Sequence, residues 1–457
     1  MKQILILLLF ISSFTQAQFS VNGTLKSSLE TDWVILYKIE GARQKFIQNT
    51  TLKKDSVLID GEKQEISTFK FDLLQDTKKG TYRISYKTDG TGFLDFIFNN
   101  ENVRVAFHPE YPEQTAIFYE SEENIIYREY LNEILPAQQK LDSLQITALQ
   151  QPNKNLSSNY ASLLSGILQI QSKYITETEG MYVQPFIKAT LRTNSDEIKT
   201  SAKEYMTTIS STFFDHMDFS NQALKSSAFL INRITDFVFY INYSENPEVQ
   251  QNIYKKSIQT VFSKIDDDAF KSEVIEFLIA QFETTKNLEI IDFLFEEYYD
   301  KLPEIHQNRT FASEKKSLFA SEIGRIAPDF SWIENGKTLK LLSLKEAKNY
   351  VLVFWSTTCS HCLREIPELH KLTSNNKDVK VIAFSLEDDK YGWESYKENL
   401  HGWHNVLGLK KWQNKTARTY NIHSTPSYFI LDANKKIIAK PADLEDLKLF
   451  IEGVSEK

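Results

Sequence analysis

The chain has 457 residues, of which 41% are hydrophobic and 25% charged, and its formal net charge is -8. This length favours several domains over a single core, and we expect three. The composition excludes extensive disorder and a fibrous fold. The modest negative charge offers no broad basic surface for phosphate groups, so we expect no nucleic-acid partner.

Residues 1–17 have the pattern of an export signal. Lys2 supplies the positive charge, an apolar run extends from Ile4 to Ile11, and the small-residue site Thr15-Gln16-Ala17 predicts cleavage after Ala17. The apolar run is much shorter than the roughly 20 residues that a spanning helix needs. We therefore expect a protein that is periplasmic or secreted after signal removal, without stable membrane insertion.

Residues 18–120 have the period-two pattern of half-buried strands. Apolar residues alternate with polar ones, as in the segment 82–86. The apolar segments 93–98 and 102–107 flank an Asn-Asn-Glu sequence at 99–101, whose Asn residues tolerate the left-handed backbone of a tight turn. This pattern predicts a hairpin there and an antiparallel β-sandwich for the whole region.

At Ser121 the apolar period changes to 3.6 residues, which predicts a central all-α region over 121–315. The acidic pair Glu122-Glu123 suits the positive end of a first helix, and Pro136 is expected to break or kink it. Further apolar stripes, including one along 270–282, indicate ordinary packing between helices rather than a ligand pocket. Residues 307–321 are polar and mixed in charge, so we interpret them as a connection between domains.

From residue 322 to the end, strand and helix patterns alternate. The runs Tyr350 to Phe354 and Val379 to Phe384 are almost continuously apolar, as expected for strands that are buried on both faces. An amphipathic helix is predicted between them, and a Cys-x-x-Cys sequence begins just after the first strand. This order of elements predicts an α/β domain over 322–457.

Cys359 and Cys362 are the only cysteines in the chain. A bond between residues three apart closes too short a loop to stabilise much, so the pair suits a reversible disulfide. At the start of the helix, Cys359 faces unpaired N–H groups that stabilise a thiolate, which makes it the attacking sulfur; Cys362, one turn inside, would resolve the mixed disulfide. A zinc site with His361 or His370 would need a second Cys-x-x-Cys, and we expect no metal.

The segment from Trp355 to Pro367, with Trp four residues before Cys359 and Pro eight after it, resembles the active-site stretch of the thioredoxin superfamily. Ala-Pro-Asp-Phe at 327–330 and Thr425-Pro426 narrow the resemblance to the TlpA/ResA-like exported thiol-disulfide oxidoreductases, over residues 322–457. The resemblance implies a thioredoxin-like fold without a cofactor. It also implies a cis Pro426 facing the cysteines, with Trp355, Thr425 and Pro426 binding the substrate.

The chain departs from thioredoxins proper at Val353, where they carry a buried carboxylate. The resemblance to ResA-like proteins makes Glu387 the candidate proton acceptor for Cys362, with Asp388 as the alternate; an exposed acidic loop is the competing interpretation for both.

Four other polar residues are candidates for the site: Ser360, His361, His404 and His423. Ser360 and His361, between the cysteines, are expected to tune the redox potential, since a positive His361 would stabilise the Cys359 thiolate. We assign no role to His404 and His423.

We therefore predict an exported thiol-disulfide oxidoreductase that reduces other proteins. Its partners would be exported proteins bearing disulfides or thiols, together with an upstream electron donor of unknown identity. Two rival functions remain: a thiol peroxidase, whose Pro-containing Thr/Ser and Cys loop is missing, and a non-catalytic, redox-sensitive binding protein. For the two leading regions we expect a role in binding, positioning or dimerisation.

Overall fold

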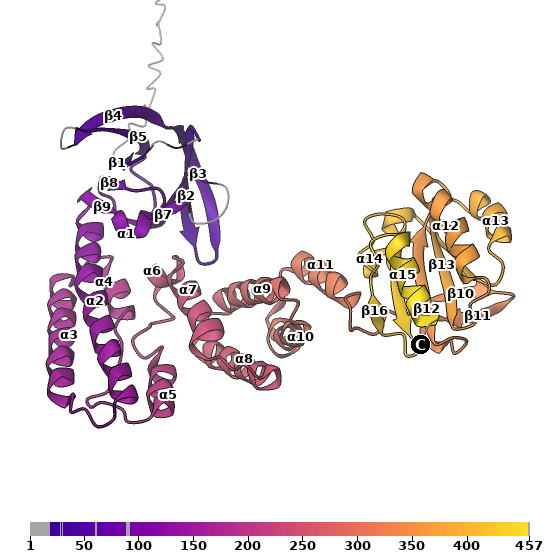
Figure 1. The fold of residues 1–457 in the computed structure, drawn as a ribbon. Coiled ribbons are helices and arrows are strands. Elements are labelled where there is room, and N and C mark those ends of the chain that lie inside the picture. Colours follow the sequence, from indigo (N-terminus) through magenta and orange to yellow (C-terminus); the bar gives the residue numbers. More distant parts are fainter. Residues whose placement is uncertain (1–18, 28, 30, 60–61, 88–91, 456–457) are drawn as a thin grey trace, which may run out of the picture. The chain divides into compact units, whose positions relative to one another are not determined.

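The computed structural model describes residues 19–27, 29, 31–59, 62–87 and 92–455 (Figure 1). The predicted export signal at 1–17 lies outside the described residues. The chain forms two compact units, one ending at His306 and the other beginning at Gln307. The first contains two β-sheets and a helical region, and the second is an α/β domain, so the predicted order of fold classes is confirmed. The predicted domain boundaries remain predictions.

The two sheets of the first unit pack as a sandwich around one core. One sheet has the strand order β4-β5-β1-β8-β9 and the other has the order β3-β2-β6-β7. Side chains from both sheets, such as Val21 and Phe71 on one and Leu36 and Tyr82 on the other, belong to the same buried cluster. The strands are β1 (Phe19–Leu25), β2 (Trp33–Glu40), β3 (Arg43–Thr51), β4 (Lys53–Ile59), β5 (Glu62–Leu73), β6 (Gly80–Ser85), β7 (Phe93–Phe98), β8 (Val103–Phe107) and β9 (Ile117–Glu120).

The predicted hairpin around Asn99-Asn100-Glu101 is wrong. Asn100 does adopt a left-handed backbone, with φ of 60°. However, β7 pairs with β6 in one sheet, whereas β8 pairs with β1 and β9 in the other, so the turn carries the chain between sheets. The pairing of β1 with β8 is parallel, unlike the other pairs of the sandwich. Alternation of apolar residues shows which face of a strand is buried, but it does not specify the neighbouring strand.

The long helix α2 begins directly after Ser121. The Ser121 side chain accepts a hydrogen bond from the Asn124 amide and caps α2, whose first turn carries the predicted acidic residues. Helix α2 is not broken at Pro136, because buried side chains on either side, Ile134 and Leu141, hold the helix in place; the kink expected there stays a prediction. The helices are α1 (Pro112–Thr115), α2 (Glu122–Gln150), α3 (Ser157–Glu177), α4 (Gln184–Ala189), α5 (Ala202–Thr212), α6 (Gln222–Lys225), α7 (Phe229–Thr235), the π-helix η1 (Asp236–Ile241), α8 (Pro247–Phe262), α9 (Asp268–Thr284) and α10 (Leu288–Glu297).

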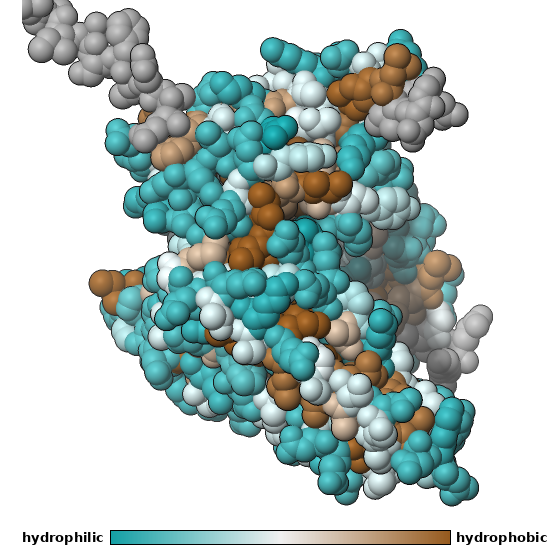
Figure 2. Space-filling model, turned by 90° about the vertical axis from the view of Figure 1, so that its left-hand side faces the viewer, coloured by the Kyte–Doolittle hydropathy of each residue, from teal (hydrophilic) through white to brown (hydrophobic). Residues whose placement is uncertain are grey.

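The surface of the first unit is largely hydrophilic on the face drawn in Figure 2, where hydrophobic side chains are interspersed among hydrophilic ones. Along α2 and α3 the exposed apolar residues include Leu135, Ile146 and Leu168. Of the helices in the described ranges, none is both long and apolar enough to cross a membrane.

The second unit is built on one mixed sheet of order β14-β13-β12-β15-β16. The central strand β12 (Asn349–Trp355) lies parallel to β13 (Val379–Glu387) and antiparallel to β15 (Ser427–Asp432). Both faces of the sheet are covered by apolar clusters, which explains the continuous apolar runs in β12 and β13. The other elements are β10 (Ser331–Glu334), β11 (Lys337–Lys340), α12 (Ser360–Thr373), α13 (Tyr391–Tyr396), β14 (His404–Leu409), α14 (Lys415–Thr419), β16 (Ile437–Ala439) and α15 (Leu444–Ser455).

The predicted connection at 307–321 is instead largely the helix α11 (Arg309–Ala320), which belongs to the second unit. Asn308 caps its first turn by accepting a hydrogen bond from the Phe311 amide. Phe319 is buried, and Ser321 donates a hydrogen bond from Oγ to the Tyr420 carbonyl at 3.2 Å. The segment has a polar composition because most of its helical surface faces water, whereas a few apolar residues attach it to the domain.

Candidate redox-active site

Strand β12 and helix α12 position the two cysteines. The chain leaves β12 at Trp355, and Cys359 is the N-cap of α12. Its sulfur accepts a hydrogen bond from the Cys362 amide at 3.2 Å, and its thiol donates to the Thr425 carbonyl at 3.2 Å. Cys359 is partly exposed, whereas Cys362 has no exposed surface, and neither is in a disulfide. The predicted contrast between an accessible and a buried sulfur is therefore present in the fold.

The surroundings shift the two thiols in opposite directions. Partial burial opposes ionisation of Cys359, but hydrogen bonds from the Cys362 thiol, the Thr425 side chain and the backbone amides of His361 and Cys362 outweigh it and lower its pKa. The pKa of Cys362 is raised to about 12. Burial is the largest cause, and the hydrogen bond with Cys359 contributes to the same increase. At neutral pH, Cys359 is thus the better nucleophile and Cys362 keeps its proton.

The loop before β15 lies against Cys359. Its Thr425-Pro426 peptide bond is cis, as predicted, and the Thr425 carbonyl accepts the hydrogen bond from Cys359. Thr425 and Pro426 are each partly exposed. A partner that approaches Cys359 would therefore meet this loop as well.

Glu387 lies at the end of β13 and is only 3% exposed. Its carboxylate accepts hydrogen bonds from the Thr357 amide at 2.7 Å and the Thr357 hydroxyl at 3.0 Å, and from the hydroxyls of Ser356 and Ser385. The interpretation of this residue as part of an exposed loop is therefore wrong. It does fit Asp388, which is exposed and pairs with Lys411 at 2.7 Å. Glu387 holds the loop that leads into the cysteines.

Comparisons with known proteins match this same part of the chain. Residues 322–446 match the Redoxin family model. The thiol-disulfide oxidoreductase ResA of Bacillus thuringiensis is 28% identical over 150 residues, which cover 32% of this chain and 83% of that protein. ResA of Geobacillus thermodenitrificans is 27% identical over the same shares.

Solved structures that are similar to this chain include domains of thiol-disulfide oxidoreductases. The thioredoxin domain of a thiol-disulfide oxidoreductase from Bacteroides vulgatus is 27% identical, with a TM-score of 0.26, and the match covers 29% of this chain and 97% of that one. A thiol:disulfide interchange protein from a Bacteroides species is 27% identical, with a TM-score of 0.27, over 31% and 93% of the two chains.

The second unit is a TlpA/ResA-like domain of the thioredoxin superfamily. The predicted resemblance is confirmed, and so is the enzyme class, a thiol-disulfide oxidoreductase. Proteins of this class exchange electrons with thiol or disulfide partners and with an electron donor.

One predicted contact in this TlpA/ResA-like domain needs correction. Trp355, expected to bind substrate, has no exposed surface, and its ring packs against Tyr396 with centroids 5.1 Å apart. A residue without exposed surface cannot contact a partner protein directly. Trp355 belongs to the buried apolar cluster that also contains Cys362, so its role is in the packing around the buried cysteine.

The sequence reasoning missed a second acidic residue of the TlpA/ResA-like domain. Tyr428 on β15 is buried and lies opposite Val353, the position where thioredoxins proper carry a carboxylate. Its hydroxyl donates to Glu365 at 2.8 Å, and Glu365 lies one helical turn after Cys362. Burial raises the pKa of Tyr428, and Glu365 and Cys362 raise it further. The spacing of three residues from Cys362 is a signal that could have identified Glu365.

The remaining polar residues lie in different surroundings. Ser360 and His361 are exposed at the start of α12. His404 is buried between Glu334 and Glu346, at 2.9 Å and 3.2 Å, and His423 is exposed and bonds Asn421 at 2.9 Å.

Proposed function

We propose that this protein is an exported thiol-disulfide oxidoreductase that reduces disulfides in partner proteins through Cys359 and Cys362. The observation that carries the proposal is the contrast between the two thiols. Cys359 is partly exposed at a helix start with a lowered pKa, whereas Cys362 is fully buried with a pKa raised to about 12. Such a pair separates attack from resolution.

In the first step, the Cys359 thiolate attacks one sulfur of the partner's disulfide. A mixed disulfide forms, and the partner's other sulfur leaves as a thiolate. Cys362 then loses its proton and attacks the Cys359 sulfur, which releases the partner's second thiol and forms the Cys359–Cys362 disulfide. The partner gains two electrons and the protein loses two, and an upstream thiol donor must return them.

The second step needs a proton acceptor, and two carboxylates are candidates. We retain Glu387, which is buried and bonded to the loop that carries Cys359. Glu365 is the rival, since it is bonded to the buried Tyr428, whose pKa responds to the charge of Cys362. The variants Glu387→Gln and Glu365→Gln distinguish the two candidates. Loss of the residue that deprotonates Cys362 should slow only the release of the partner.

The loop at Thr425-Pro426 is proposed to bind the partner's backbone next to its disulfide. The Thr425 carbonyl already accepts a hydrogen bond from Cys359, so this loop lies next to the attacking sulfur. An extended segment that pairs with this loop would present its sulfur to Cys359.

The direction of electron flow and the location are part of the proposal. A lowered Cys359 pKa, to which the His361 amide contributes, makes the pair more oxidising, whereas the family likeness favours a reductant. We expect a reduction potential nearer to that of thioredoxin, about -270 mV, than to that of DsbA, about -120 mV. Export to the periplasm or beyond follows from the signal pattern at 1–17.

The experiment that tests the proposal is trapping with Cys362→Ala. Without the resolving thiol, the mixed disulfide on Cys359 should persist, and non-reducing gels should show discrete adducts that disappear when a reductant is added. Cys359→Ala is the matched control and should trap nothing. Because the chain has no third cysteine, no other thiol can form the adduct.

Absence of adducts from cells and from a model disulfide would favour a redox-sensitive binding protein instead. Consumption of hydrogen peroxide by the wild type at rates above its disulfide reduction would favour the thiol peroxidase.

A further inference from the structure

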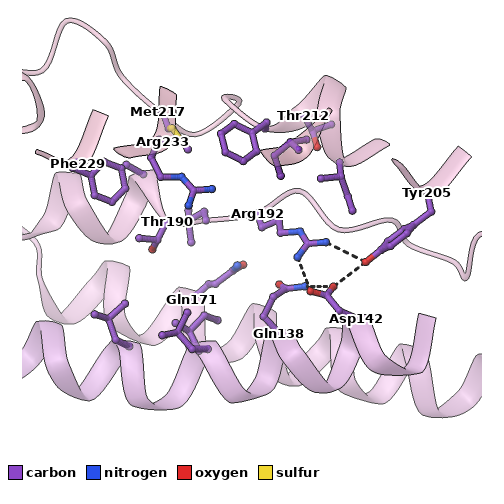
Figure 3. Close-up of a pocket in the computed structure, with 18 of the residues that line it drawn as sticks. Gln138, Asp142, Gln171, Thr190, Arg192, Tyr205, Thr212, Met217, Phe229 and Arg233 are labelled. Carbon is purple, nitrogen blue, oxygen red and sulfur yellow. Dashed lines mark hydrogen bonds and ion pairs between the residues drawn. The ribbon is translucent and has the colours of Figure 1, made fainter. Parts of the chain in front are cut away.

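The helical region of the first unit contains a cavity of about 480 Å³ (Figure 3). Helix α2 forms one side, and α5, α7 and the segment that follows α4 contribute most of the others. Its volume lies within the range of about 300–1,000 Å³ that is typical of small-molecule sites.

Most of the lining is apolar. Helix α2 contributes Leu131, Ile134 and Leu135, and Phe213 and Phe229 face them from the α5 and α7 side. An apolar wall of this kind accommodates a hydrocarbon chain, because burial there removes the chain's apolar surface from water.

One end of the cavity carries an arginine that is already held in place. Arg192 donates to Asp142 at 2.7 Å and to the Tyr205 hydroxyl at 3.2 Å, and Tyr205 also donates to Asp142 at 3.1 Å. Figure 3 shows these three side chains joined at one end of the cavity. The network fixes the guanidinium and neutralises its charge with one carboxylate.

A second arginine enters the same cavity. Arg233 extends from α7 and lies over the Phe213 ring, 4.5 Å from its centroid. Its carboxylate partner, Asp236, is 3.0 Å away and 41% exposed, and it does not line the cavity. Burial lowers the pKa of Arg233; Asp236 opposes this effect, and the charge of Arg192 lowers the pKa further. Arg192 and Arg233 both line this cavity.

The third polar group is Gln171 on α3. Only 9% of this residue is exposed, and its amide makes no hydrogen bond to the described residues. Figure 3 shows Gln171 and Arg233 pointing into the cavity from opposite sides. The amide therefore keeps its hydrogen-bonding groups available to a molecule that enters the cavity.

We propose that this cavity binds a small monocarboxylate with an apolar chain. Arg192 is paired with Asp142, whereas Arg233 bonds Asp236 through Nη1 alone, so the other N–H groups of the Arg233 guanidinium are the ones offered to a ligand carboxylate. A guanidinium binds a carboxylate through two parallel hydrogen bonds, and the Gln171 amide adds a donor. The apolar walls take the chain. This site lies in the first unit and does not depend on the proposed redox function.

Titration calorimetry of the full mature chain with octanoate tests the proposal. We expect one octanoate per chain, with 1-octanol at least tenfold weaker because it has the same chain without the charge. Acetate, which has the charge without the chain, should not bind measurably. Equal binding of octanoate and octanol, or no binding of octanoate to the wild type, would overturn the proposal.

Variants locate the site. Arg233→Gln should weaken octanoate at least tenfold, and Gln171→Leu should weaken it several-fold while leaving octanol unchanged. Arg104→Gln is the matched control, since Arg104 pairs with Glu120 at 2.9 Å on the sheet surface and should leave binding unchanged. If Arg233→Gln does not fold, Gln171→Leu decides alone, and wild-type octanoate affinity in a folded Gln171→Leu or Arg233→Gln protein refutes the site.

Discussion

The strongest quantitative prediction concerns the buried thiol of Cys362. With its pKa raised to about 12, about one molecule in ten thousand carries the thiolate at pH 8. A free cysteine of pKa about 8.5 is about one-quarter ionised at that pH, so burial suppresses the thiolate more than a thousandfold. Cys359 should titrate in the opposite sense, below 8.5.

Single-cysteine variants allow each thiol to be followed alone by its ultraviolet thiolate absorbance. In Cys362→Ala, the remaining Cys359 should titrate below about 8.5. In Cys359→Ala, the remaining Cys362 loses the contribution of its neighbour but keeps its burial, so its midpoint should stay above that value. In urea both should titrate as free cysteine. A folded Cys359→Ala protein whose thiol titrates as it does in urea would refute the burial argument.

The same pKa predicts a change in stability with pH. Below about pH 8.5 the Cys362 thiol is protonated in both states. Between that pH and about 12 the unfolded chain loses the proton while the folded chain keeps it, so the free energy of unfolding falls by about 1.4 kcal/mol per pH unit. Cys362→Ala should lack this part of the slope in urea titrations.

Three further predictions follow from particular contacts. Glu387→Gln should slow the release of the mixed disulfide but leave the first attack nearly unchanged in stopped-flow assays, and equal slowing of both steps would contradict its role. The fragment 307–457 should fold and reduce a model disulfide. Removal of residues 307–321 from this fragment should lower its free energy of unfolding in urea by about 2 kcal/mol, because it exposes the surface that buries Phe319. Gly23→Ala should destabilise the sandwich by about 1–3 kcal/mol, because the added methyl group overlaps the Phe69 ring; Thr24→Ala is the neighbouring control, and equal effects would contradict the steric reason.

Features with a local cause could be predicted from the sequence. The apolar runs of β12 and β13, the cap at Ser121 and the position of Cys359 at a helix start depend on residues close together in the chain. A helix start supplies unpaired N–H groups wherever it occurs, so the low pKa of a cysteine there follows from the pattern. The cis Pro426 was implied by the family resemblance and is present in the fold.

Features that depend on distant residues were decided by the tertiary structure. The alternating pattern of β7 and β8 shows their buried faces, yet only the packing of two sheets gives these strands different partners. Trp355 is an aromatic residue in a known motif, and only the fold shows that the sheet and Tyr396 enclose it. The bond between Glu365 and Tyr428 joins residues 63 positions apart.

The cavity of the first unit has the same origin. Apolar periodicity in this region predicts packing between helices, but spacing along one helix does not show whether the opposite helix fills the space. Arg192, Arg233 and Gln171 come from three separate segments, and each is ordinary in its own sequence context. Local sequence determines which side chains can ionise or donate, whereas the packing of distant segments determines which of them share one enclosed volume, and a binding site requires both.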